Sequence, residues 1–287
     1  MSLASLYLKA AVGAVGPRAS QLPDAEIARS VAVDRARLAE YARVCGFPVD
    51  DVLPPTYPHV LGFVLQVELM AARSFPLALP GLVHIRNTII AHRRIDASEQ
   101  LDLRVHAERF VAHPKGVQVD LVARVSVAGE DVWEGRSTYL ARGASAPVAQ
   151  EERADVPAVD PHGPPTAVWR VDADTGRRYA HVSGDVNPIH LHPLTAKAFG
   201  FPRAIAHGMW TAARALASLQ GRLPDALTFD VAFGKPLLLP STVELRTRAQ
   251  RDGWMLDVRS RDTPHMRATV RSALPPSGKP RSGHQAT

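Results

Sequence analysis

The sequence predicts an α+β protein built from two similar units that are joined by a linker. A short motif occurs twice with the same spacing, as Tyr41, Ala42, Val44 and Gly46 and again as Tyr179, Ala180, Val182 and Gly184. Each copy is followed by an apolar segment with helical periodicity and then by alternating segments typical of strands. An internal repeat of this kind indicates a duplicated structural unit. Between the copies, residues 141–166 are rich in Pro, Ala, Asp and Glu and have no periodicity, which is typical of a linker.

The first unit is expected to span residues 1–140. A helix is predicted over Pro58–Arg73, and apolar residues alternate with polar ones over Leu101–Ala107 and over Val117–Val127. Residues Ala128–Asp131 then turn the chain towards Trp133 and Tyr139. This unit is therefore predicted to be one long helix followed by antiparallel strands.

The second unit is expected to span residues 167–274 and to have the same order. Apolar residues recur at helical spacing from Ile205 to Leu219. Strands are predicted over Val243–Thr247, Trp254–Arg259 and His265–Val270. The tail, residues 275–287, is polar and rich in helix breakers, so disorder is expected there. Each sheet would wrap round its own helix, and two sheets joined edge to edge would leave fewer exposed strand edges.

Composition limits the classes of function. The 287 residues are 46% hydrophobic and 22% charged, which is typical of a folded globular protein. The net charge of +6 favours anionic partners, but scattered arginines and only 6% aromatic residues argue against nucleic acid. The positive field suits the phosphates of coenzyme A or an acidic carrier protein, and a basic surface without a specific partner is the alternative.

The single cysteine and the N-terminus predict a location. Cys45 cannot form an intramolecular disulfide and lies in an apolar stretch, so a reducing compartment is expected. Lys9 interrupts the apolar N-terminal segment and no basic segment precedes it, which argues against a secretory signal and against a membrane span. The protein is therefore expected to be cytoplasmic.

The most informative segment runs from Tyr179 to His190, and Ala204–Trp210 follows it. It places Asp185 and His190 five positions apart on a loop that Pro188 kinks. Such a loop brings a carboxylate and an imidazole to one water molecule, as general acid–base catalysis requires. The alternative is that the aspartate caps a turn and the histidine lies on the surface. The joint occurrence of Asp, Asn, Pro and His, followed by His-Gly at a helix start, favours catalysis.

This segment resembles the signature of the MaoC-like family of (R)-specific enoyl-thioester hydratases. A looser resemblance to its double hot-dog members, which act as 3-hydroxyacyl-thioester dehydratases, spans about residues 31–274. The resemblance implies reversible hydration of trans-2-enoyl thioesters to (R)-3-hydroxyacyl thioesters in fatty acid metabolism. It implies Asp185 and His190 as the catalytic pair, Asn187 as their orienting neighbour, and the Gly208 amide as oxyanion donor. A helix start suits that last role, because its N–H groups lack intrahelical partners.

Three further residues are candidates for substrate contacts. Lys235, before Pro236, would meet a phosphate of the substrate, unless it is simply solvated. Ser183 is expected to pack or to hydrogen-bond behind the site, and His207 to orient the backbone at the helix start. No metal site is expected, because His190 and His192 have no cysteine and no obvious third ligand beside them. No phosphate-binding glycine loop and hence no nucleotide cofactor is expected.

The first unit is expected to be catalytically silent. Residues 47–57 separate Gly46 from Pro58, whereas residues 185–205 separate Gly184 from Ala206, so the first segment is ten residues shorter. Phe47 stands where the catalytic aspartate stands in the second unit, and Gly62 is out of register with the oxyanion donor. The expected role of this unit is to complete the sheet and to shape an acyl-chain groove from apolar residues, namely Phe47, Leu61, Phe63 and Leu65.

Two other functions remain open from sequence alone. A hot-dog thioesterase would need a water positioned at the carbonyl carbon, and the Asp-x-Asn-Pro-x-His loop argues against it. A non-catalytic acyl-thioester-binding protein is the other alternative. The sequence leaves open whether the acyl group is carried by coenzyme A or by a carrier protein. It also leaves open whether the protein is a monomer or a homodimer.

Overall fold

The computed structural model describes residues 18–144, 154–160 and 163–273. The tail that was expected to be disordered lies outside these ranges. The strands are β1 (Ile27–Val31), β2 (Leu82–Ala91), β3 (Leu101–His113), β4 (Gly116–Val127), β5 (Glu130–Arg142), β6 (Ala167–Val171), β7 (Leu227–Phe233), β8 (Ser241–Gln250), β9 (Gly253–Ser260) and β10 (Thr263–Ser272). The helices are α2 (Arg35–Cys45), α3 (Tyr57–Ala71), α4 (Thr175–Ser183), α5 (Pro188–Leu191), α6 (Pro193–Ala198) and α7 (Gly208–Ala217).

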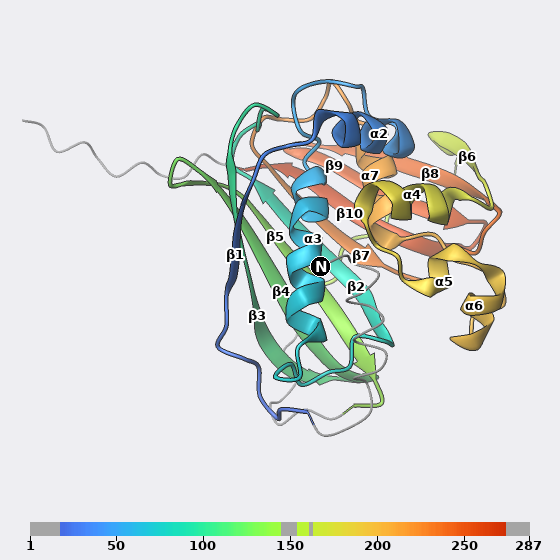
Figure 1. The fold of residues 1–287 in the computed structure, drawn as a ribbon. Coiled ribbons are helices and arrows are strands. Elements are labelled where there is room, and N and C mark those ends of the chain that lie inside the picture. Colours follow the sequence, from blue (N-terminus) through green and yellow to red (C-terminus); the bar gives the residue numbers. More distant parts are fainter. Residues whose placement is uncertain (1–17, 145–153, 161–162, 274–287) are drawn as a thin grey trace, which may run out of the picture.

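The described strands form one antiparallel ten-stranded sheet in the order β1-β3-β4-β5-β2-β7-β10-β9-β8-β6 (Figure 1). The first five belong to one half of the chain and the last five repeat their order in reverse. The halves meet where β2 pairs with β7, from Arg86 opposite Ala232 to Ala91 opposite Leu227. The predicted edge-to-edge junction of two similar sheets is therefore confirmed. The two strands that form it were not predicted, and neither were the short strands β1 and β6.

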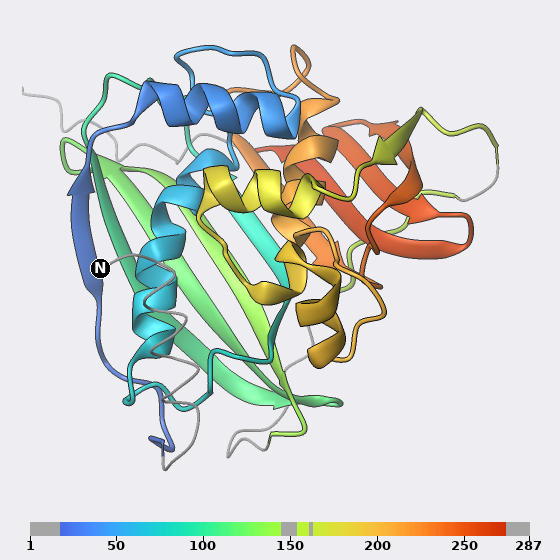
Figure 2. The same cartoon turned by 45° about the vertical axis from the view of Figure 1, so that its right-hand side comes forward.

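The repeated motif is a helix that ends on a left-handed glycine. Gly46 closes α2 with φ 80°, and Gly184 closes α4 with φ 78°. A side chain at such a φ is disfavoured, so glycine is the default residue there. The helices α2 and α4 pack side by side above the sheet (Figure 2), with the rings of Tyr41 and Tyr179 6.2 Å apart. After the two glycines the halves diverge, with Phe47 in one and Asp185 in the other.

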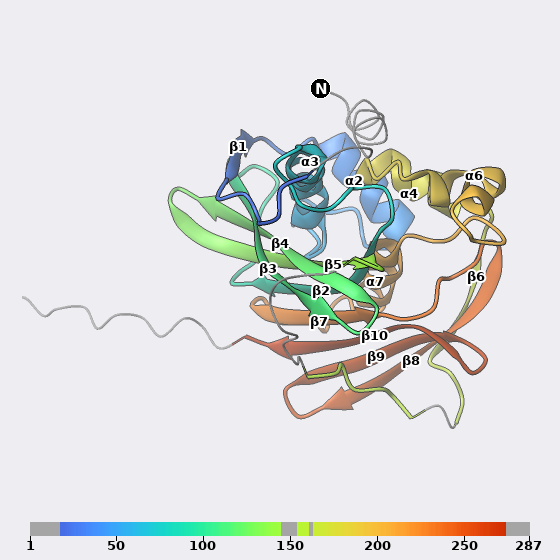
Figure 3. The ribbon, with the colours of Figure 1, turned by 90° about the horizontal axis from the view of Figure 1, so that it is seen from below.

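The predicted central helices are confirmed, with small shifts of their ends. The helices lie on one side of the sheet (Figure 3). Helix α3 packs on β3 and β4, and a Cβ at Gly62 would lie 3.3 Å from Ala123. Helix α3 is therefore packed closely against the sheet. Helix α7 begins at Gly208 rather than at Ile205, which pairs instead with Leu238 in an isolated bridge.

Two features bear on the remaining sequence predictions. Cys45 is a buried free cysteine, and burial raises the pKa of its thiol to about 12, which makes it a core residue rather than a nucleophile. Among the described residues, every helix is too short or too polar to cross a membrane. The predicted linker begins inside β5, which ends at Arg142. Its other described residues form no helix or strand before residue 167, and Arg86 on the sheet donates to the Ala154 carbonyl (2.8 Å).

The junction of the two halves contains an ion pair. Arg86 on β2 donates through Nε to Oδ1 of Asp230 on β7 (3.0 Å), and the Thr88 hydroxyl donates to the same oxygen (3.0 Å). The side chains of Arg86 and Asp230 are only 19% and 15% exposed. Removing one partner would leave the other poorly solvated and without its opposite charge.

We expect Asp230→Ala to lower the free energy of unfolding by about 2 kcal/mol, since hydrogen bonds to charged groups contribute about that much. Urea denaturation of the purified protein measures it. Asp225→Ala is the matched control, because Asp225 pairs with Arg94 across the same two halves but is 73% exposed. The control should change stability little. Equal losses in both variants would contradict the role of the pair.

Candidate active site

Local hydrogen bonds fix the loop that carries Asp185. The Ser183 hydroxyl donates to the Tyr179 carbonyl (2.8 Å) and accepts from the Asp185 backbone N–H (3.1 Å). The Asn187 backbone N–H donates to Oδ1 of Asp185 (3.2 Å). The carboxylate is therefore oriented by its own chain. Ser183 is buried, and its hydroxyl hydrogen-bonds to backbone groups of Tyr179 and Asp185.

A short helix turns His190 inward. Asn187 caps α5 by accepting from the Ile189 N–H (3.4 Å), and Pro188 occupies the first helical position, where its missing N–H costs nothing. His190 is 8% exposed, and its Nδ1 lies 2.8 Å from the Ile205 carbonyl oxygen. A carbonyl only accepts, so Nδ1 carries the proton. The neutral ring therefore keeps a lone pair on Nε2.

His207 holds the loop against α7. It occupies the N-cap position of that helix without a side-chain capping bond. Its Nε2 donates to the Asp185 carbonyl oxygen (2.9 Å) and lies 3.7 Å from the carboxylate Oδ2. Its ring stacks on His190 with centroids 3.7 Å apart. Burial is the main cause that lowers the pKa of both rings, that of His207 to about 3. Both imidazoles are therefore neutral near pH 7.

Gly208 is the first residue of α7, so its N–H has no intrahelical acceptor. A Cβ at this position would lie 3.0 Å from the ring of Phe233. A side chain at this position would therefore crowd the Phe233 ring at the end of β7. In the described part of the first half, the corresponding helix α3 begins at Tyr57, and Gly62 lies within that helix.

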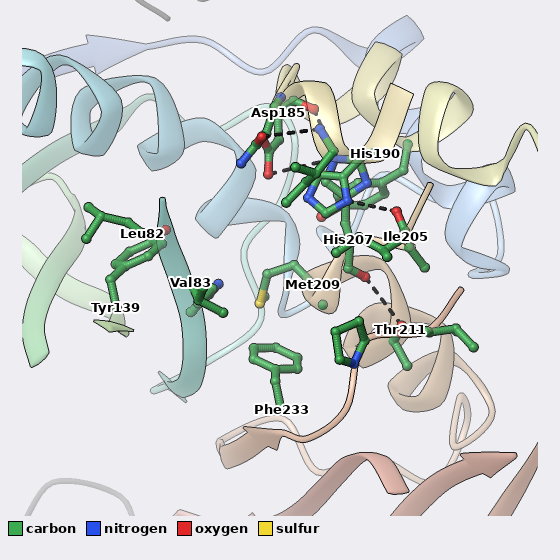
Figure 4. Close-up of a pocket in the computed structure, with 18 of the residues that line it drawn as sticks. Leu82, Val83, Tyr139, Asp185, His190, Ile205, His207, Met209, Thr211 and Phe233 are labelled. Atoms are coloured by element: carbon green, nitrogen blue, oxygen red, sulfur yellow. Dashed lines mark hydrogen bonds and ion pairs between the residues drawn. The ribbon is translucent and has the colours of Figure 1, made fainter. Parts of the chain in front are cut away.

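These groups face one cavity with an empty volume of about 1270 Å³, which includes space open to solvent. Figure 4 shows Asp185, His190 and His207 on one side and Tyr139, Leu82 and Val83 on the other. The lining residues include Asp185, Asn187, His190, His207, Gly208 and Phe233 from the second half. The first half contributes His59, Val60, Phe63, Met70, Leu79, Leu82, Val83, His84, Tyr139 and Arg142. The cavity is thus shared between the two halves.

The comparisons with known proteins agree with this arrangement. Residues 159–273 match the model of the MaoC like domain. The chain is 40% identical to 3-hydroxyacyl-thioester dehydratase X of Mycobacterium tuberculosis over 92% of this chain and 96% of that protein. The chain belongs to the MaoC-like family. The crystal structure of HtdX of Mycobacterium tuberculosis superposes with a TM-score of 0.77 at 38% identity, over 87% of this chain and all (100%) of that one.

A MaoC-like dehydratase of Phytophthora capsici shares the fold, with a TM-score of 0.72 at 18% identity over 89% of this chain and 97% of that one. The predicted double hot-dog architecture is confirmed by these neighbours together with the repeated strand order. Solved structures of thioesterases also share the fold, with TM-scores of 0.55 and 0.51 at 10% and 11% identity. Architecture alone therefore does not separate the two reaction types.

The rim of the cavity in this MaoC-like protein carries positive charge. Lys235 is exposed at the cavity rim, where Arg142 from the end of β5 is also exposed. The backbone at Lys235 is held by His265, whose Nδ1 lies 2.8 Å from the Lys235 carbonyl oxygen. The rim therefore offers two cations from opposite halves of the chain.

Two sequence-based expectations need correction. His192 caps α6 on the surface. However, the side chains of Asp185, His190 and His207 each place one possible metal-ligand atom within 4.8 Å of the others. The expectation that His190 has no further potential metal ligand beside it was therefore wrong. Two of the four ring nitrogens of His190 and His207 already bond to backbone carbonyl groups.

Of the four apolar residues expected along a groove, Phe63 lines this cavity, whereas Phe47 lines a different pocket beside Trp133.

The sequence reasoning missed the polar residues that the first half contributes. His59 lies on α3, His84 on β2 and Tyr139 on β5, and all three line the cavity. The histidine inside the largely apolar segment Tyr57–Ala71 was the available signal. A fully apolar helix would have served the core better, so a buried imidazole at that place indicates a specific role.

Buried neutral histidines make stability depend on pH. Burial lowers the pKa of His59 to about 4 and that of His207 to about 3, from 6.5. The unfolded chain therefore binds protons near pH 6.5 that the folded chain does not bind. The free energy of unfolding should fall as pH decreases from about 6.5, by about 1.4 kcal/mol per pH unit for each such group.

Denaturation by urea between about pH 7 and about pH 5 measures this slope. His59→Phe should reduce the dependence of the unfolding free energy on pH by the contribution of one protonating group. A slope of zero, or one that His59→Phe does not alter, would show that these rings are not kept neutral by the fold.

Proposed function

We propose that the protein catalyses reversible hydration of trans-2-enoyl thioesters to (R)-3-hydroxyacyl thioesters in fatty acid metabolism. The observation that carries the proposal is the convergence of the Asp185 carboxylate, the His190 imidazole and the N-terminus of α7 on one cavity. The name of the relative that is 40% identical, 3-hydroxyacyl-thioester dehydratase X, describes the same reaction.

The two acceptors define how the proton moves. The His190 Nδ1–H is committed to the Ile205 carbonyl, so at rest His190 Nε2 and the Asp185 carboxylate both accept hydrogen bonds from one water. One of these groups removes a proton from the water as its oxygen bonds to the β-carbon. The same group then returns that proton to the α-carbon. This sequence needs no second acid and favours addition of both atoms to the same face of the double bond.

Charge develops on the thioester oxygen when water attacks the β-carbon. The Gly208 N–H, at the N-terminus of α7, would stabilise this charge, which is typically worth about 3 to 4 kcal/mol. At the rim, Arg142 and Lys235 would bind phosphate groups of coenzyme A or of the phosphopantetheine of a carrier protein. Asn187, Ser183 and His207 would position the loop rather than the substrate.

The test is hydration of crotonyl-CoA, followed as loss of the enoyl absorbance. A coupled (S)-specific dehydrogenase should give no signal, because the expected product is the (R) isomer. The assay should be unaffected by a metal chelator, since no proposed step uses a metal. Release of free thiol without hydration would identify a thioesterase. Binding of acyl-CoA with neither product would identify a non-catalytic acyl-binding protein.

The shared cavity also predicts the chain length of the substrate. Phe63, Met70, Leu79 and Leu82 provide an apolar wall beyond the site. Each buried methylene adds up to about 0.8 kcal/mol, so kcat/KM should rise from about four carbons towards medium length and level off when the cavity is full. Steady-state rates on enoyl-CoA substrates of about four to about sixteen carbons measure this. Activity confined to the shortest substrate would contradict it.

A further inference from the structure

Three polar aromatic side chains stand in a row on the wall that the first half contributes. The rings of His59 and His84 stack with centroids 6.0 Å apart, and those of His84 and Tyr139 stack at 4.7 Å. All three belong to the cavity lining, and they come from α3, β2 and β5. The Tyr139 hydroxyl donates to Oε1 of the buried Gln66 (3.3 Å), so the tyrosine is held from behind.

Two buried nitrogens of this row lack hydrogen-bond partners. Within the described part of the chain, Nδ1 of His59 and Nε2 of His84 are buried and make no hydrogen bond. His59 is 4% exposed. An unsatisfied buried nitrogen costs free energy, and phenylalanine would fill the same space without that cost. The pattern indicates a group that is bound during function.

The charge of the row restricts what that group can be. Burial keeps both imidazoles neutral, with pKa values of about 4 for His59 and about 3 for His84. Each neutral ring carries one N–H donor and one lone pair, and in His84 the backbone of Arg86 already interacts with the ring. The negative charge of Asp185 acts on both rings, which disfavours a carboxylate at this place. A neutral hydroxyl or ketone matches the row best.

We propose that His59 and His84 bind a hydroxyl or keto group on the acyl chain of the substrate, at a carbon beyond the reacting double bond. This inference rests on the proposed hydration of enoyl thioesters and narrows its substrate class to oxygenated acyl chains. A plain methylene chain leaves both nitrogens unpaired. A site built for a hydrogen bond discriminates against the ligand that lacks it.

The experiment compares two sets of trans-2-enoyl-CoA substrates of equal length. One set is unsubstituted, and the other carries a single hydroxyl or keto group at successive carbons. The wild-type protein should prefer at least one substituted substrate by about tenfold in kcat/KM, which corresponds to about 1.4 kcal/mol. In His59→Phe and in His84→Phe this ratio should fall to near one. Because the readout is a ratio, losses common to both substrates cancel.

Met70→Leu is the matched control, because it changes the same cavity wall without changing hydrogen bonding, and its ratio should equal that of the wild type. His59→Phe should also raise the melting temperature, since it removes an unsatisfied buried nitrogen. No hydration of any enoyl-CoA would overturn the proposed function itself. Hydration with no preference for any substituted chain, or with a preference that both Phe variants keep, would overturn only this inference.

Discussion

Asp185→Asn and His190→Ala should each lower kcat by at least about a hundredfold, because general acid–base groups typically supply about 10² to 10⁴ in rate. Asn keeps the size of the Asp185 side chain and can still accept from the Asn187 N–H, so the loop should keep its shape. His190→Ala removes the lone pair that faces the cavity, together with the bond to Ile205. The hydration of crotonyl-CoA by the purified variants measures both effects.

The double variant should be scarcely slower than either single one, because two groups that act on one water form a unit. His181→Ala is the matched control: this histidine lies on α4 near the same loop, is 78% exposed, and should leave kcat unchanged. Far-UV circular dichroism and melting curves check that the variants fold. Near-wild-type rates in Asp185→Asn would place the chemistry elsewhere in the cavity.

The sequence was sufficient for the parts of the site that are local in the chain. Asp185, Asn187 and His190 lie within one short loop, and its geometry follows from a glycine cap, a proline and an asparagine cap. Each of these features has a recognisable residue signature. The position of Gly208 at a helix start was predicted for the same reason, although the predicted helix began three residues too early.

The sequence was insufficient where the structure depends on distant contacts. Strand β2 carries Arg86 and does not alternate cleanly. Strand β7, which carries Asp230, does alternate from Leu227 to Val231 and was missed despite that signal. The two charges are compatible with a central strand only because they pair with each other across the junction. The cavity wall from the first half could not be foreseen for a similar reason. His59 and Tyr139 are far apart in sequence, and only the paired sheet brings them opposite Asp185.

The comparison of two substitutions at Gly208 isolates its backbone N–H. Gly208 occupies the first helical position, where proline is tolerated because the N–H has no intrahelical acceptor. The preceding residue, His207, has φ −66° and ψ 136°, a conformation that a following proline favours. Proline therefore removes the proposed oxyanion donor while α7 keeps its start. Alanine adds a Cβ but keeps the N–H.

We expect Gly208→Pro to lower kcat by about 10² to 10³ relative to Gly208→Ala, the range found when one oxyanion donor is removed. Both variants place a Cβ about 3.0 Å from Phe233, so both should also lose activity through this contact. Combining each with Phe233→Leu makes room for the new side chain and should restore much of the Gly208→Ala activity. It should restore little of the Gly208→Pro activity, because a missing N–H is not replaced by space. Equal kcat values for the alanine and proline variants in the Phe233→Leu background would show that the amide of residue 208 does not bind the developing charge, and that the glycine is needed only for its small size.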